Sequence, residues 1–366
     1  MPSLTFRALG LCCALALAVG CNNATTQPGR DTGTTNPGED AATPADDTGT
    51  VTPHDAAVYD AGPFSTDCRT LTFPSVHVTG GMENTQCVIL DLGNDLPLHV
   101  GSIHNVLPEA SHHFIVYRAS ATATETTTPF DCTPFVDTLS ADSGSPLMIT
   151  QRADETLTLP PGVAYTLPAH QLMRLELHYI NLTGTAVDVS PTATLCPAAT
   201  YTDEADFLFI GNPDVNVPAH STATLGPTFY RLDSRFSGAH FFALTGHTHQ
   251  LGTNVIIQTG VRAGPFTDVY NVPSWSWQEP DVVVSDPPFV LPANGGFNFT
   301  CEWNNPTNTA VGFGESATAE MCFFWAYYYP AHAGAPHVCV HTDQIAGGFD
   351  LCCPGSPVCA MLSSRF

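Results

Sequence analysis

Short runs that alternate apolar and polar residues recur along most of the chain, and segments rich in Pro, Gly and Asn separate them. The most prominent runs are "LTFPSVHV", "TQCVILDL", "HHFIVYRA", "LMRLELHYIN", "YTDEADFLFIG", "AHFFALTGHTHQLGTNVIIQTG", "PFVLPANGGFNFTCEW" and "EMCFFWAYYYP". A period of two is the pattern of a half-buried β-strand, and helical spacing is hard to find. The pattern therefore predicts an all-β protein.

These runs form two groups of similar size, which favours two tandem antiparallel β-sandwich, jelly-roll-like domains. We place the first domain over residues 65–200 and the second over residues 201–335, with the boundary in "PAATYTDEADF". A Cys-rich tail follows over residues 336–366. No short-period repeat is visible.

The N-terminal residues lack the strand pattern and indicate export. Over residues 1–21, Arg7 precedes the short apolar run "ALGLCCALALAVG", which is too short to span a bilayer. The run ends in "LAVGC", which resembles a bacterial lipobox with Cys21 as the lipidated residue, although Ala18 stands where Leu is usual. Ordinary cleavage by signal peptidase is the alternative.

Residues 22–64 are dominated by Thr, Asp, Pro, Gly and Ala, a composition that predicts a disordered tether. The sequence thus predicts a lipid-anchored protein of the bacterial cell envelope that contacts the membrane only through its anchor.

The chain is strongly acidic, with a formal net charge of −24, and its ten basic residues are all Arg. Because little positive charge is available to neutralise phosphates, we expect no nucleic-acid partner. The acidity itself favours solubility.

Cysteine usage fits export. Of thirteen cysteines, Cys12 and Cys13 lie in the signal and Cys21 at the lipidation position, which leaves ten, enough for five disulfides. A zinc ribbon competes for the C-terminal group in "HVCVHTDQIAGGFDLCCPGSPVC". The adjacent cysteines in "LCCP" and the oxidising compartment favour disulfides.

Histidines in strand-like apolar contexts are the main candidates for chemistry: His112 and His113 in "SHHFIVY", His178 in "LELHYIN", and His247 and His249 in "TGHTHQLG". Strand side chains alternate, so the two imidazoles of an HxH pair share one face. A lone strand histidine is usually a hydrogen-bonded core residue, but an HH pair combined with an HxH pair points to a metal. Imidazole suits zinc, copper, iron and nickel.

The residues around the HxH pair argue against several metal-enzyme classes. Metallo-β-lactamase-like sites have an Asp-His after the HxH pair, and none follows "HTH". Amidohydrolase barrels often use a carbamylated Lys, and the chain has no Lys. Multicopper oxidases need several HxH pairs, and the chain has one. A soft thioether, which selects Cu(I), is available from Met321 in "EMCFFWAYYYP". Core filling is the alternative role for this methionine.

In order, the HH pair, "LELHY", "HTHxLG", and "EMC" followed by "YYYP" resemble the copper type II ascorbate-dependent monooxygenases over roughly residues 65–335. The resemblance implies two β-sandwich domains that each hold one copper ion. His112, His113 and His178 would bind the electron-transfer copper. The catalytic ligands would be His247, His249 and Met321, at the copper where dioxygen is activated. The implied disulfides are Cys68–Cys196, Cys87–Cys132 and Cys301–Cys322.

The resemblance also implies hydroxylation of a C–H bond with O₂ and ascorbate or another one-electron reductant. The chain departs from the peptide-amidating branch at Thr245, where that branch has Arg, and at Phe323 and Trp325, where it has Asn and Tyr. A carboxylate clamp is therefore missing, so we expect a small apolar or aromatic substrate. A non-catalytic surface copper-binding protein, or an unrelated β-sandwich module for adhesion or carbohydrate binding, are the alternative functions.

Overall fold

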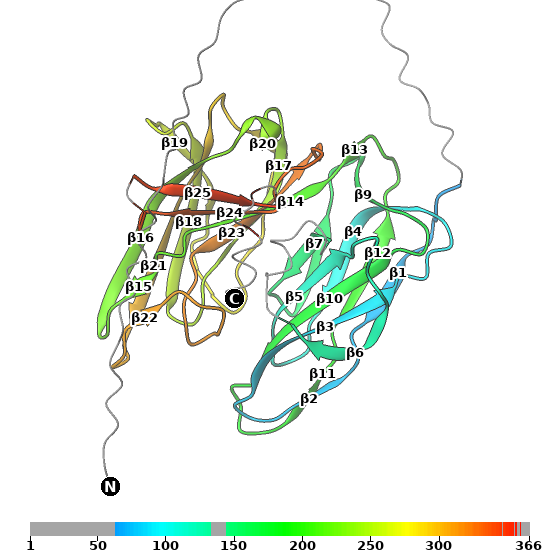
Figure 1. Cartoon of the computed structure of the whole chain (residues 1–366), viewed down its shortest axis with the longest axis horizontal. Helices are drawn as coiled ribbons and strands as arrows, with labels where there is room; N and C mark the ends of the chain where they lie inside the picture. Colours follow the sequence, from blue (N-terminus) through cyan, green and yellow to red (C-terminus); the bar gives the residue numbers. More distant parts are fainter. Residues whose placement is uncertain (1–62, 133–143, 346, 355, 357–358, 360–366) are drawn as a thin grey trace, which may run out of the picture. The chain divides into compact units, whose positions relative to one another are not determined.

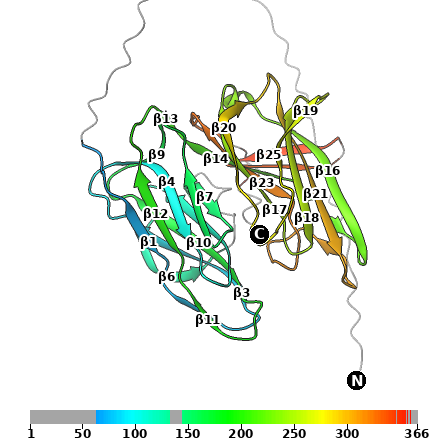
Figure 2. The same cartoon turned by 180° about the vertical axis from the view of Figure 1, so that it is seen from behind.

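The paired strands form two groups of sheets, and the strands of each group come from one continuous stretch of the sequence (Figures 1 and 2). The computed structural model describes residues 63–132, 144–345, 347–354, 356 and 359. The predicted signal, the lipidation at Cys21 and nearly all of the predicted tether lie outside these residues. Among the described residues, no helix is long and apolar enough to cross a membrane.

The N-terminal sheet group is built from strands between Arg69 and Glu204. Its first sheet contains β1 (Arg69–Thr72), β12 (Thr192–Pro197), β4 (Leu98–Val106), β9 (Val163–Leu167), β13 (Asp203–Glu204) and, paired to β4, β8 (Asp154–Thr158). Its second sheet has the order β6 (Thr126–Asp131), β3 (Glu83–Asp91), β10 (Leu172–Ile180), β5 (Ser111–Arg118) and β7 (Ser145–Thr150). A two-stranded ribbon joins β2 (Val76–Val78) to β11 (Val187–Val189).

The C-terminal sheet group spans Asp206 to Cys353. Its larger sheet has the order β20 (Val283–Val290), β17 (His240–His247), β23 (Phe323–Tyr329), β14 (Asp206–Gly211), β24 (Val338–Thr342) and β25 (Phe349–Cys353). Its smaller sheet has the order β16 (Ser221–Arg231), β21 (Gly296–Asn305), β18 (Gly252–Gly260) and β19 (Phe266–Asn271). A ribbon of β15 (Asn216–Val217) and β22 (Val311–Gly312) and the 3₁₀ helix η3 (Ser234–Phe236) complete it.

The all-β prediction is confirmed, and the paired sheets of each group are those expected of a β-sandwich. Pairing is antiparallel except between β13 and β9 and between β14 and β24. Strand β13 pairs with a strand of the N-terminal sheet group, whereas β14 pairs with strands of the C-terminal group. The chain therefore passes from one sheet group to the other between these two strands. The division into two tandem domains stays a prediction, because Tyr59–Phe366 groups as one compact unit.

Strand β23 is buried on both faces, which explains its continuous apolar sequence "FFWAYYY". Phe324, Ala326 and Tyr328 pack into the core between the two C-terminal sheets. The alternate residues Trp325 and Tyr327 belong to the core that also contains the N-terminal sheets. On β14, likewise, Phe207 and Phe209 belong to the core that contains the N-terminal sheets, and Leu208 and Ile210 to the core between the C-terminal sheets. The larger C-terminal sheet therefore has one face in each core.

Candidate metal centre

A β-bulge brings His112 and His113 to the same side of the N-terminal sheet. His178 on β10 is in register with His113, and Tyr179 is in register with Ser111, so His112 is the extra residue of the bulge. A bulge re-aims one side chain, which lets two consecutive residues face the same way. The ring centroids of His112 and His113 lie 5.2 and 4.8 Å from that of His178.

Glu83, the first residue of β3, holds the far side of His178. Its Oε1 lies 3.1 Å from Nε2 of His178, whose Nδ1 lies 3.1 Å from Nε2 of His113. Hydrogen bonding with His178 lowers the pKa of Glu83 to about 2, against the opposing effect of burial. A carboxylate partner of this kind fixes the orientation of an imidazole.

His247 ends β17 and His249 follows two residues later, and their ring centroids lie 5.1 Å apart. Nδ1 of His247 lies 2.6 Å from Oε1 of Gln151, and Nδ1 of His249 lies 3.2 Å from the carbonyl oxygen of Ala319. Because carbonyl oxygens only accept, each Nδ1 carries the proton. The lone pair of each ring is therefore on Nε2.

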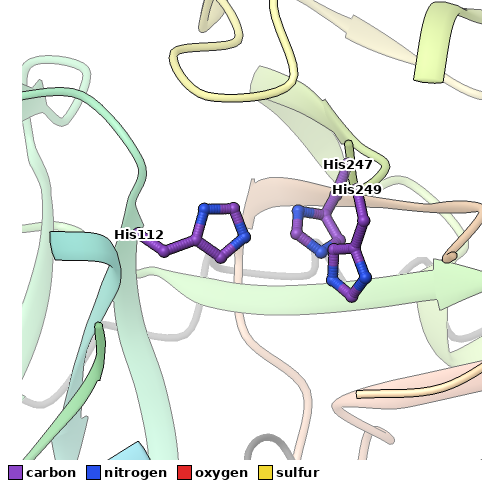
Figure 3. Close-up of side chains that lie close together, drawn as sticks. All are labelled: His112, His247 and His249. Carbon is purple, nitrogen blue, oxygen red and sulfur yellow. The ribbon is translucent and has the colours of Figure 1, made fainter. Parts of the chain in front are cut away.

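His112 lies against this pair, as Figure 3 shows. One ligand nitrogen from each of His112, His247 and His249 lies within 4.8 Å of the other two, and all three residues are buried. Nε2 of His112 is buried and has no hydrogen-bond partner in the described part of the chain. A buried nitrogen without a partner, on a histidine that lies close to two others, fits a metal ion.

The five predicted histidines thus form one cluster, although the resemblance implies two separate sets. His112 lies 5.3 Å from His113 and 6.0 Å from His247 between ring centroids, so it adjoins both sets. Within the cluster, His112, His113 and His178 lie close to one another, and so do His247 and His249. The assignment of His112, His113 and His178 to one ion stays a prediction.

Four of the five histidines, His112, His113, His247 and His249, are uncharged near neutral pH. Burial, followed by repulsion from neighbouring imidazoles, lowers the pKa of His112, His113 and His247 well below the ordinary histidine value. Burial likewise lowers the pKa of His249 to about 4. Neutral imidazoles keep the lone pairs that a metal requires.

Met321 is buried and belongs to the core shared with the N-terminal sheets. The preceding segment contacts His249 through Ala319 and through Glu320, whose Oε2 accepts a hydrogen bond of 2.9 Å from the backbone N–H of His249. The following residue, Cys322, is disulfide-bonded to Cys301 on β21. The backbone of Met321 is therefore held next to the HxH pair, and coordination by its sulfur stays a prediction.

Glu320 is a buried carboxylate that organises this segment. Besides His249 it accepts hydrogen bonds from the backbone N–H of Leu251 at 2.6 Å and from Nε1 of Trp303 at 2.8 Å. Burial raises the pKa of Glu320, and these hydrogen bonds oppose the rise. Its role was not predicted, because a lone Glu in "AEMC" has no sequence signal of burial.

A pocket of about 210 Å³ opens beside His112. Its walls come from residues 109–112 and 180–183 of the N-terminal group and from Trp277 and Gln278, which follow β19. The ring of Trp277 lies 5.4 Å from that of His112 between centroids. Glu109 is the ionisable residue at the rim, since the other lining side chains apart from His112 are neutral.

The described cysteines form five disulfides. Three of them, Cys68–Cys196, Cys87–Cys132 and Cys301–Cys322, are the pairs that the resemblance implies. Cys339–Cys352 and Cys353–Cys359 close the tail, which excludes the zinc ribbon considered for these four cysteines. Cys87 and Cys132 also lie near Glu176, but sulfurs joined in a disulfide are not thiolate ligands.

Residues 205–345 match the family model of the copper type II ascorbate-dependent monooxygenase C-terminal domain. The match contains His247, His249 and Met321, whereas His112, His113 and His178 lie before it. The comparison with curated proteins gives no match.

Among solved structures, the major capsid protein P2 of bacteriophage PM2 is similar at a TM-score of 0.33 and 8% identity, covering 74% of this chain and 100% of that one. An infectious bursal disease virus particle is similar at a TM-score of 0.17 and 11% identity, covering 75% and 73%. Similarity at this level does not establish a common fold.

Proposed function

Because the chain belongs, through residues 205–345, to the copper type II ascorbate-dependent monooxygenase family, we propose that it hydroxylates a C–H bond of a small apolar or aromatic molecule. The reaction uses O₂ and an external one-electron reductant, ascorbate or another. The observation that carries the proposal is the buried cluster of five histidines, in which His112 adjoins both predicted sets of ligands. Copper, when bound, supplies one-electron redox chemistry and activates dioxygen.

Two copper ions are proposed, with ligands from the five histidines and Met321. His113 and His178, completed by His112, hold one ion, and His247, His249 and Met321 hold the other. Imidazoles accommodate both oxidation states of copper, and a thioether favours the reduced one. The tautomers inferred from the contacts with Gln151 and Ala319 support this use of the pair, since they leave Nε2 of His247 and His249 as the coordinating atoms.

We assign a one-ring substrate to the pocket beside His112, because the ring of His112 lies 6.0 Å from that of His247, a ligand of the proposed oxygen-activating copper. Its volume of about 210 Å³ suits a small molecule, and Trp277 offers a face for stacking. No Arg or Lys lines this pocket. Thr245 is buried in place of a cationic clamp, and the ring of Trp325 lies 5.7 Å from that of His247. A carboxylate-bearing substrate would therefore be bound without a counter-charge.

The envelope location belongs to the proposal as well. The lipobox-like "LAVGC" supports attachment through a lipid on Cys21, and "NNATTQPGRDTG" begins a polar spacer. In a bacterial host, labelling with a fatty-acid analogue and fractionation should place the chain in the membrane fraction, and Cys21→Ser should release it. Equal labelling of the Cys21→Ser variant would contradict the anchor.

Turnover tests the enzymatic proposal. The full exported chain is loaded with copper, and reductant-dependent oxygen uptake is followed with a panel of single-ring aromatic compounds under ¹⁸O₂. Incorporation of one ¹⁸O atom into product, lost in His247→Ala, is expected. Two bound copper ions without uptake would favour a copper-binding protein that lacks turnover. Failure to bind copper would favour a β-sandwich module with structural histidines.

A further inference from the structure

Gln151 contacts His247 across the boundary between the two sheet groups. Gln151 directly follows β7 of the N-terminal group, and His247 ends β17 of the C-terminal group. Both residues are buried, and the distance of 2.6 Å between Oε1 and Nδ1 is the direct side-chain contact between them. The HxH pair, although its backbone is entirely C-terminal, is therefore completed by an N-terminal residue.

The chemistry of this contact decides which nitrogen of His247 is available. An amide oxygen accepts but cannot donate, so it holds the proton on Nδ1 and leaves Nε2 as the lone-pair atom. Without the contact, the ring is free to rotate or to take the other tautomer, whose protonated Nε2 cannot bind metal. A hydrogen-bond partner of a metal-binding histidine typically changes metal affinity by about 10–100-fold.

A second cross-boundary contact serves the neighbouring histidine. Glu83 of β3 accepts hydrogen bonds from the backbone N–H of Ala317 at 2.7 Å and from Oγ of Ser316 at 3.1 Å. These residues begin the segment whose Ala319 carbonyl accepts from His249. Both members of the HxH pair thus depend on residues of the N-terminal group for their orientation.

We propose that Gln151 is a positioning residue that prepares His247 for copper, so that copper affinity at the HxH pair depends on contact between the two sheet groups. The inference rests on the proposed function only in taking copper as the metal. It requires neither turnover nor a particular substrate. It also predicts the reverse coupling, in which copper at the pair strengthens the contact between the groups.

The test compares Gln151→Leu, which removes the acceptor, with Gln151→Glu, which keeps one. Cu(I) affinity is measured by competition with a colorimetric chelator, without substrate or oxygen. Gln151→Leu should weaken binding of one ion about 10–100-fold, whereas Gln151→Glu should bind at least as tightly as the wild type. Gln171→Leu is the matched control, since Gln171 is also buried and its amide donates to the Ala119 and Leu172 carbonyls instead. It should lower stability with copper affinity unchanged.

A second measurement determines which ring nitrogen of His247 carries the proton in the metal-free protein. ¹⁵N NMR of the imidazoles should place the proton of His247 on Nδ1 in the wild type and in Gln151→Glu, and redistribute it in Gln151→Leu. Unchanged copper affinity and an unchanged tautomer in Gln151→Leu would overturn the inference. Should the protein bind no copper, the proposed function fails, and the tautomer measurement still decides the role of Gln151.

Discussion

Glu83 lies 3.1 Å from Nε2 of His178 through the same Oε1 atom that accepts a 2.7 Å hydrogen bond from the backbone N–H of Ala317. One carboxylate therefore orients a histidine of the N-terminal set and anchors the segment that leads to Met321. Orientation of one set of ligands and placement of the other are physically joined at this residue.

Replacing Glu83 should disturb both sets. In Glu83→Ala, we expect copper affinity to fall about tenfold and hydrogen exchange to rise over residues 315–321. Both effects follow because His178 and Ala317 lose the same partner. Glu83→Gln keeps an acceptor and should restore much of the protection of Ala317. An exchange pattern identical to that of the wild type in Glu83→Ala would contradict this role.

Met321 is the one proposed ligand that is not a histidine, and loss of its sulfur separates coordination from core filling. Met321→Ile keeps an apolar side chain of similar size but removes the thioether. We expect hydroxylation to be lost, one copper ion to be retained, and the sulfur scattering of Cu(I) X-ray absorption to disappear. A variant that still hydroxylates would assign Met321 to the core alone.

The Cys301–Cys322 disulfide fixes the residue next to Met321 to the smaller C-terminal sheet. Its sequence separation of 21 predicts that the paired change to Ala lowers the free energy of unfolding by about 3 kcal/mol. The looser backbone should also weaken copper binding at the HxH pair. Thermal unfolding and Cu(I) competition measure the two effects.

The tail disulfide Cys353–Cys359, with a separation of 6, is the matched control for that experiment. Its removal should cost less stability, because the loop it closes is shorter. Copper affinity should stay at the wild-type value. Equal losses of affinity in both paired variants would mean that the effect reports general destabilisation.

Local periodicity was sufficient to predict much of the fold. The runs "HHFIVYRA" and "LMRLELHYIN" correspond to β5 and β10, and "EMCFFWAYYYP" contains β23. Strand β16, with its sequence "STATLGPTFYR", was not predicted, because only Ala223 and Leu225 alternate with Thr before Gly226 and Pro227 interrupt the pattern.

The candidate site was predictable only in its histidines and methionine. HH and HxH are visible as short patterns, whereas Gln151 and Glu83 stand alone in "TQRAD" and "GMENT" without any periodic signal. Their roles arise from contacts 96 and 234 residues away, at His247 and Ala317. Likewise, the grouping of His112 with the HxH pair depends on a bulge and on packing between sheets, neither of which is encoded locally.

Glu155 on β8 should make stability depend on pH. Burial raises its pKa from 4.5 to about 7, although Arg152 and hydrogen bonds from Thr150 and Gln151 oppose the rise. The folded chain therefore retains a proton that the unfolded chain has released. Stability from this group is complete below about pH 4.5, the ordinary value, and is lost as the pH rises towards 7.

Glu155→Gln removes this titration. The variant should match the wild type near pH 4 and exceed it above pH 7, by at most about 3 kcal/mol for a shift of this size. Urea unfolding at several pH values measures the difference. A constant difference across the range would show that Glu155 does not carry the pH dependence.

Replacing Trp277 should weaken substrate binding and leave copper binding unchanged. Its ring forms a wall of the pocket beside His112 but supplies no metal-binding atom. Loss of a stacking face removes on the order of 1 kcal/mol of binding, so Trp277→Ala should raise KM several-fold with copper stoichiometry and Cu(I) affinity unchanged. Trp275 in the same loop packs near Gly246 and does not line the pocket, so Trp275→Ala should lower Tm with KM close to the wild-type value. If instead Trp277→Ala left KM unchanged for every substrate tested, the pocket beside His112 would not be where the substrate binds.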